Sequence, residues 1–480
     1  MEWRIKIRKA RSRLHWLLLL VLIAYLFIGH KLERRIGSRK WSHPRRRVPR
    51  KIKALVDLWS KVLERGHNST NLPRALLPPH IQDCKRCEEL HTKMDNRGKN
   101  GELPPWNLWK DLVHGGDDDN LPLTRLVQQD LWLHQHPKNC SNARFLLAHW
   151  HSQTAPIGVG SQMVFLSAIL SSAVSEGRVF VTLPFSGADH EGCTGSNHLR
   201  WSCYFAPEAA KECIHRVLEL YSDESAWKSG ILKRSDNVFD PWAGVPNRHW
   251  GEPWKKMQPT EELDGNLIAN TNETNERVWW RAQAYRYLLR FPSEYLCNLL
   301  NQARHRAFGV NAAEKVMLSI TKDWQLNSSQ PDDAKVWVPR PIVSVHVRQG
   351  DKSYEMTLHP LKDYMNLANA LRRKFPELHS VWLSTEMQTV VDESDEFTDW
   401  EFYFTEVRRQ YGTMHMTEYM ESLGTKTAFD NSFINLVMAL EADFFVGALG
   451  SSWSYAINCL RLTGGKLKAG FLTVNINTVL

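Results

Sequence analysis

A group of polar and charged side chains directly follows one short apolar segment of the sequence. Residues 342–347 read as a buried strand, and residues 348–352 then read Arg-Gln-Gly-Asp-Lys. An arginine in this place can hold a diphosphate through two hydrogen bonds and can stabilise it as it leaves. His346 alternates with Arg348, so we expect both side chains on the same side of the strand. The residue types are equally consistent with an ion-pair network that caps the strand.

The segments around this group alternate between apolar strands, turns of small residues and amphipathic helices, which is typical of an α/β fold. The first set comprises predicted strands at 145–148 and 178–183 and a helix at 162–175. The second set comprises strands at 342–347, 381–384 and 443–447 and helices at 359–375 and 433–440. The sequence therefore predicts two α/β domains, 131–335 and 336–480.

Two glycines mark a second corner at which a ligand could bind. Gly158 and Gly160 follow the first predicted strand and precede a helix. Ligands of doubly wound sheets bind beyond the carboxyl ends of the strands, where helix N-termini present backbone N–H groups. Glycine would let the backbone approach a phosphate or sugar closely, although an ordinary tight turn explains the pattern as well.

The charge of the chain is concentrated near its start. The formal net charge is +9, but arginines and lysines crowd into the first 51 residues, and the remainder is close to neutral. This distribution argues against nucleic acid as a partner of the folded part. Between the basic blocks, residues 16–30 form an uncharged apolar run, which we interpret as a signal-anchor that follows a cytosolic tail at 1–15.

Residues 31–130 are rich in Arg, Lys, Pro, Asn and Gly, and we interpret them as a stem. The acidic run at 117–119 lies in a turn-like stretch and is expected to be a solvated loop rather than a metal site. Eight cysteines, even in number and without a second closely spaced pair, favour disulfides over zinc. Asn-x-Ser/Thr triplets, which would be glycosylation sites in a lumenal chain, lie at Asn68, Asn139, Asn272 and Asn327.

Several of these segments, in the same order, resemble motifs of the α1,6-fucosyltransferases of the core N-glycan and chitooligosaccharide types. The signature is Val345–Lys352, then Glu355, then the sequence His-Pro-Leu-Lys-Asp-Tyr-Met from His359. Further similarity covers 158–162, 279–290, 381–386 and 442–452. Together the matches span residues 140 to 462, and their collinearity is more specific than any single motif.

The resemblance implies a GT-B-like enzyme with two Rossmann-type domains facing a cleft, an inverting mechanism, GDP-fucose as donor and no required metal or other cofactor. Arg348 would hold the β-phosphate, while His346, Gly158, Gly160, Ser451 and Ser452 would line the donor site. Glu355 would be the general base for the acceptor hydroxyl, with Asp351 and Lys352 arranging hydroxyl and base. Assigning Glu355 requires a one-residue gap, and an exposed loop glutamate is the alternative.

Two departures from the family pattern bear on the donor. Gln349 replaces a second arginine, and Asn435 replaces an aspartate that would accept hydrogen bonds from guanine. The sequence therefore supports the class of donor, a nucleotide sugar, better than it supports the identity of the nucleotide base. We expect the chain to be a single-pass type II protein of the Golgi membrane that transfers fucose to a glycan or glycoprotein. We also consider that it forms a homodimer. Peptide O-fucosylation and a lumenal pseudoenzyme or glycan-binding protein are the alternatives.

Overall fold

The computed structural model describes residues 48–65, 78–85, 120–150, 158–235, 244–246, 250–257, 262–263, 266–267, 276–321, 339–467 and 469–475. Ala54–Leu480 form one compact unit and Met1–Lys53 form another. The expected tail and anchor, the 117–119 run, Cys87 and the triplets at Asn68, Asn272 and Asn327 lie outside the described residues. In the part that is described, every helix is too short or too polar to cross a membrane.

The first sheet is parallel and has three strands. Its order is β2 (Val179–Thr182), β1 (Phe145–Ala148) and β3 (Leu232–Arg234). Helix α6 (Val159–Ser175) connects β1 to β2, and α7 (Lys211–Leu220) and α8 (Glu224–Lys228) lie between β2 and β3 in the chain. Every residue of β1 and β2 is buried, as expected for parallel strands with helices on both faces.

The second sheet is also parallel and has five strands. Its order is β10 (Leu472–Thr473), β9 (Phe444–Gly447), β6 (Ile342–His346), β7 (Ser380–Ser384) and β8 (Glu401–Tyr403). The chain connects these strands through α11 (Leu361–Lys374), α12 (Gln388–Glu393), α13 (Met416–Leu423), α14 (Thr425–Glu441) and α15 (Ser452–Leu462). From β6 the chain builds outward first through β7 and β8, then on the other side through β9 and β10. The strand order therefore reverses between β6 and β9, where doubly wound folds bind ligands.

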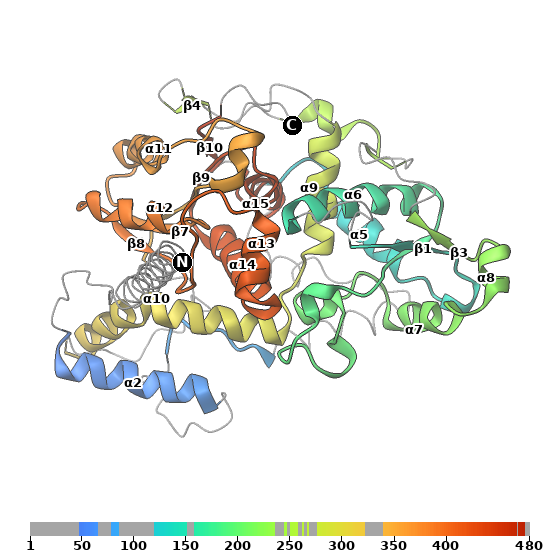
Figure 1. Cartoon of the computed structure of the whole chain (residues 1–480), viewed down its shortest axis with the longest axis horizontal. Helices are drawn as coiled ribbons and strands as arrows, with labels where there is room; N and C mark the ends of the chain where they lie inside the picture. The colour runs from blue at the N-terminus through green and yellow to red at the C-terminus, as the bar shows by residue number, and fades with distance from the viewer. Residues whose placement is uncertain are drawn as a thin grey trace, which may run out of the picture. The chain divides into compact units, whose positions relative to one another are not determined.

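Both sheets share one apolar core. It includes Leu146 and Phe180 of the first sheet and Ile342, Trp382 and Phe445 of the second. Helices α9 (Glu276–Leu288), α10 (Glu294–Thr321), α14 and α15 supply much of the remainder, and Figure 1 shows α14 and α15 between the two sheets. The α/β fold with parallel sheets is thus confirmed, and its core joins the two sheets through helices.

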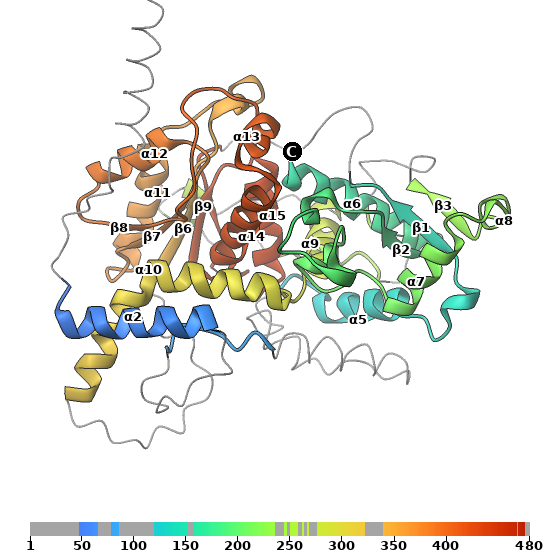
Figure 2. The same cartoon turned by 60° about the horizontal axis from the view of Figure 1, so that its bottom comes forward.

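Among the described residues, helices α2 and α5 precede the first strand. Helix α2 (Arg50–Arg65) lies beside α10 in both views (Figures 1 and 2), and its Trp59 is fully buried. The Ser60 hydroxyl and His305 Nε2 are 2.9 Å apart. Helix α5 (Thr124–Gln135) contacts α9, where the Gln128 amide donates to the Gln283 carbonyl over 2.9 Å. Both α2 and the start of α5 fall inside the segment expected to be a stem.

The other short elements lie in the connections. They are the 3-10 turns at Cys140–Asn142, Ser186–Ala188, Gly195–Asn197, Trp201–Cys203, Pro253–Lys256, Gly350–Tyr354 and Ser394–Glu396, and the strand pair β4 (Glu262–Leu263) and β5 (Asn266–Leu267). Disulfides link Cys84 to Cys297, Cys140 to Cys213 and Cys193 to Cys203. The expectation of disulfides is confirmed for these six, whereas Cys459 is a buried free thiol in α15.

Candidate active site

The ends of β6 and β9 are linked through the side chain of Ser454 at the point where the strand order reverses. His346 is the last residue of β6, and its Nδ1 lies 2.7 Å from the Ser454 hydroxyl in the first turn of α15. The same hydroxyl accepts a hydrogen bond from the Ala448 amide just after β9 (3.2 Å). Burial, with a contribution from Arg348, lowers the pKa of His346 to about 3, so this imidazole is neutral near pH 7.

Arg348 is buried just beyond β6 and is held by two carboxylates. Its guanidinium forms ion pairs with Asp351 and Glu386 and donates to the Gln349 carbonyl over 2.7 Å. Burial opposes the charge, but Glu386 and Asp351 outweigh it and raise the pKa of Arg348. The ion-pair network that the residue types allowed is therefore present, and it fixes a permanent cation at the strand end.

Asp351 connects this ion-pair network to the start of helix α13. Its second carboxylate oxygen accepts a hydrogen bond from the Met416 amide, at the start of α13, over 2.9 Å. Burial works against the charge, but the Met416 amide and Arg348 together lower the pKa of Asp351. The aspartate thus stays ionised and positions both the guanidinium and α13.

Lys352 forms a separate ion pair with Glu355, the C-cap of the 3-10 turn Gly350–Tyr354. The Lys352 side chain is only 14% exposed, whereas the Glu355 side chain is 62% exposed. A partly buried ammonium therefore orients a carboxylate that solvent or a second substrate can reach. Glu355 has the accessibility that a general base needs, and it also fits the alternative of an exposed loop glutamate.

The N-termini of two helices meet next to the end of β9. Gly158 is the N-cap of α6, and Ser451 is the N-cap of α15. The hydroxyls of Ser161 and Ser452 are 3.3 Å apart. A Cβ atom on Gly160 would lie 2.9 Å from the Trp453 nitrogen, which is closer than real Cβ contacts allow. Gly160 thus permits close backbone contact with α15, where the sequence alone had suggested contact with a ligand.

This pairing of helix ends creates a place for an anion. The first N–H groups of each helix lack partners within the helix, and the helix dipoles add positive potential at the same point. The predicted donor-site residues Gly158, Gly160, Ser451 and Ser452 therefore come together. His346 bonds to the same first turn of α15 through Ser454, and the side chain of Ser454 links this pair of helix ends to β6.

Asn435 and Gln349 are placed differently from the other predicted residues. The Asn435 carbonyl oxygen accepts from the Trp382 indole N–H (3.1 Å), and its amide donates to the Asn431 carbonyl (2.8 Å). The Gln349 amide donates to the His359 carbonyl over 3.0 Å. Asn435, a buried residue of α14, thus has both ends of its amide hydrogen-bonded, one of them to Trp382 of β7. Gln349 is hydrogen-bonded to the turn before α11.

Glu386 and Ser454 are part of the site but were not singled out from the sequence. Glu386 follows β7, the neighbour of β6, and it accepts a hydrogen bond from the backbone N–H of Gln349 (2.9 Å) as well as pairing with Arg348. A carboxylate just past the strand adjacent to β6 was the available signal, because carboxyl ends of parallel strands meet at one edge.

Among the described residues no group of three or more His, Cys, Asp or Glu side chains could hold a metal ion.

No protein-family model matches the chain. Solved structures to which it is similar include fucosyltransferase NodZ from Bradyrhizobium (13% identity, 66% of this chain and 92% of that chain, TM-score 0.31). They also include POFUT1 in complex with GDP-fucose (11% identity, 69% and 97%, TM-score 0.33). A third is a FUT1 variant from Arabidopsis thaliana in complex with GDP (9% identity, 75% and 78%, TM-score 0.30). All three are fucosyltransferases, the class that the sequence motifs resemble.

Proposed function

We propose that the protein is a glycosyltransferase that moves fucose from GDP-fucose to a hydroxyl of a glycan. The observation that carries this proposal is the convergence of one permanent buried cation, two helix N-termini and one accessible carboxylate at the strand-order reversal. The first two suit a diphosphate leaving group, and the third suits removal of a proton from an acceptor. The collinear sequence motifs favour fucose and a GT-B-like arrangement of the two sheets.

The reaction is proposed as a single displacement with inversion. The acceptor oxygen attacks the anomeric carbon, the bond from that carbon to the β-phosphate oxygen breaks, and GDP leaves with the electron pair. Glu355 takes the proton of the acceptor hydroxyl, while Lys352 holds the carboxylate in place. Arg348 and the N-termini of α6 and α15 offset the charge that develops on the diphosphate. No step assigned to these residues calls for a bound metal.

The cellular location of the protein and the identity of its acceptor are proposed from the sequence alone. The apolar run at 16–30 and the Asn-x-Ser/Thr triplets support a type II protein of the Golgi membrane with its catalytic part in the lumen. Asn139 is exposed, as a glycosylated asparagine must be. The α1,6 linkage follows only from the resemblance of the motifs.

A lumenal pseudoenzyme or glycan-binding protein is the second candidate, and two observations favour it. Arg348 already has two carboxylate partners, and the Asn435 amide is engaged by Trp382 and Asn431. A donor would have to rearrange these contacts, which would weaken binding or turnover.

The purified full chain should gain thermal stability with GDP and GDP-fucose, and it should release GDP from GDP-fucose in the presence of chelator. UDP and UDP-sugars serve as the matched controls for the base. Glu355→Gln should preserve the thermal shift and lower turnover by about 100-fold or more, because it removes the general base. Binding without turnover in the unaltered chain would favour the pseudoenzyme, and absence of binding to every nucleotide sugar would overturn the proposal.

A further inference from the structure

Tyr354 is the most exposed large apolar side chain in the part of the chain that the structure describes, at 84%. It is the last residue of the 3-10 turn Gly350–Tyr354, and it directly precedes Glu355, the proposed general base. The Glu355 side chain is also exposed, at 62%. An aromatic ring and the carboxylate that would take the acceptor proton therefore follow one another at the surface of the candidate active site.

The turn that carries Tyr354 is held at both ends. Near its start, the buried Asp351 carboxylate accepts a hydrogen bond from the Met416 amide over 2.9 Å. Just after it, the buried Met356 side chain packs so closely that a Cβ atom on Gly450 would lie 2.7 Å from its Sδ. The exposure of Tyr354 is therefore a property of a fixed turn, and its ring is presented from an anchored backbone.

A second segment, residues 410–416, lies against the same turn. The His415 Nε2 atom is 3.7 Å from a carboxylate oxygen of Asp351. Residues three apart in a 3-10 helix share a face, so Tyr354 lies on the face of the turn that Asp351 presents to this segment. Tyr411, which is 59% exposed, belongs to the segment. Exposed aromatic rings from two segments therefore border the same part of the site.

The acceptor group must lie close to Tyr354 if Glu355 is the base. A general base acts on a hydroxyl within about 2.6–3.2 Å, and Tyr354 is the next residue along the chain. A sugar ring presents C–H groups on its faces and hydroxyls around its edge. Because the face of an aromatic ring is electron-rich, it attracts such C–H groups while an edge hydroxyl reaches the carboxylate. A serine or threonine acceptor would offer the phenol ring only a methylene or a methyl group.

We propose that Tyr354 binds the acceptor by stacking against the sugar ring that carries the reacting hydroxyl. This inference rests on the proposed fucosyl transfer, and it adds the residue that favours a sugar ring over a serine or threonine side chain. Glu355 receives the proton of the hydroxyl, so Tyr354 contributes to the affinity for the acceptor and not to the chemical step.

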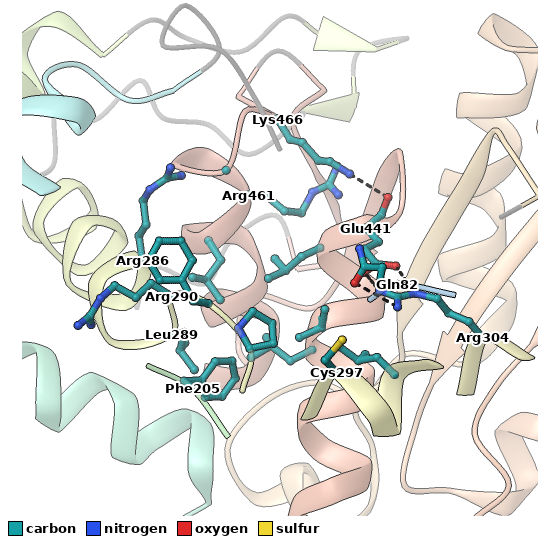
Figure 3. Close-up of a pocket in the computed structure, with 18 residues that line it drawn as sticks. Gln82, Phe205, Arg286, Leu289, Arg290, Cys297, Arg304, Glu441, Arg461 and Lys466 are labelled. Atoms are coloured by element: carbon teal, nitrogen blue, oxygen red, sulfur yellow. Dashed lines mark hydrogen bonds and ion pairs between the residues drawn. The ribbon is translucent and has the colours of Figure 1, made fainter. Parts of the chain in front are cut away.

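A small cavity elsewhere in the molecule does not meet the same requirement. It lies where α9, α10, α14 and α15 meet, and its volume is about 120 Å³ (Figure 3). Arg461 donates to the Ala442 carbonyl over 2.8 Å and Lys466 donates to the Glu441 carbonyl over 3.0 Å, so both side chains cap the end of α14. Glu355 is not in the lining of this cavity. An acceptor bound there would not reach the proposed base.

Saturation-transfer difference NMR of the full chain in the presence of GDP tests the contact. Chitotetraose and an N-glycan released from a glycoprotein serve as the two sugars. At least one of them should receive saturation, strongest at the ring C–H protons of one sugar unit. Tyr354→Ala should lower the affinity for that sugar by about threefold to tenfold, the usual contribution of an aromatic contact. Tyr354→Phe keeps the ring and should stay within about twofold of the unaltered chain.

Tyr221→Ala is the matched control, because it removes a partly exposed tyrosine just after α7, away from the second sheet. It should leave sugar binding unchanged. GDP should raise the thermal stability of the unaltered chain and of all three variants equally, since none of the substitutions touches the proposed donor contacts. Tyr354→Ala should also unfold at the same temperature as the unaltered chain, because its side chain is 84% exposed.

Transfer kinetics separate failure of this inference from failure of the proposed function. Tyr354→Ala should raise the KM for the acceptor by about threefold to tenfold, and it should leave kcat and the KM for GDP-fucose within about twofold. Equal acceptor KM values for Tyr354→Ala and Tyr221→Ala, in a protein that turns over GDP-fucose, would overturn the stacking inference alone. Binding of neither sugar, or transfer only to a glycan-free polypeptide, would do the same. An unaltered chain that neither binds GDP nor turns over GDP-fucose would overturn the proposed function and this inference with it.

Discussion

Arg348 is positioned by two carboxylates that differ greatly in their distance along the chain. Asp351 is three residues away, so its partnership was open to inference from the sequence alone. Glu386 is 38 residues away and reaches Arg348 only because β6 and β7 are adjacent parallel strands. Sequence reasoning thus placed Arg348, Asp351 and Lys352 together just past one strand, but it could not find a partner that the pairing of strands supplies.

The contribution of Glu386 can be measured by removing its charge while keeping its size. Glu386→Gln should destabilise the protein by about 2 kcal/mol, because a buried guanidinium loses one of two charged acceptors. The same change should raise the affinity for GDP, since the corner gains positive charge. Urea unfolding and GDP titration measure the two effects. Exposed Glu377→Gln is the control, and an unchanged unfolding midpoint for Glu386→Gln would show that the pair contributes little.

At the scale of elements, strands were easier to predict than long helices. The expected strand 145–148 coincides with β1, and those at 342–347, 381–384 and 443–447 match β6, β7 and β9 within one residue. These strands are short apolar runs bounded by polar residues, a pattern visible in any single sequence. Helix α10 spans 28 residues with a mixed face, and β10 has only two residues, so neither has a comparable pattern. The register of α6 against α15 depends on tertiary packing alone.

The contact between the N-termini of α6 and α15 gives the prediction at this scale. Gly160→Ala should lower stability by about 1–3 kcal/mol, because the new Cβ meets backbone atoms of Ser452 and Trp453 that cannot rotate away. Gly158→Ala is a matched control for stability, since the nearest atom to its Cβ would be Met416 Cγ at 4.0 Å. Chemical unfolding compares the two. A Gly160→Ala protein as stable as Gly158→Ala would mean that the helix ends are not in close contact.

For the molecule as a whole, buried groups with lowered pKa values set the response to pH. Burial lowers the pKa of His80 and of His346 to about 3, and it lowers that of His305 as well. Below the ordinary histidine pKa of about 6.5 the unfolded chain takes up protons that the folded chain does not, so stability falls as the solution is acidified. Lys466 changes the stability at higher pH than the histidines do, because its folded pKa of about 6 lies below the ordinary lysine value of about 10.4.

These two windows lead to a prediction for the pH dependence of unfolding. Between pH 7 and 8 the histidines are largely neutral in both states, while the unfolded chain carries a proton on Lys466 that the folded chain lacks. Stability should therefore rise with pH in this range, with a slope of up to one proton, and Lys466→Met should abolish the slope. His80→Gln should keep this slope and reduce the loss of stability between pH 6.5 and 4. Urea unfolding at constant ionic strength, in buffers without carboxylates, measures each slope. A slope that persists in Lys466→Met would mean that a group other than Lys466 binds more protons in the unfolded chain than in the folded one.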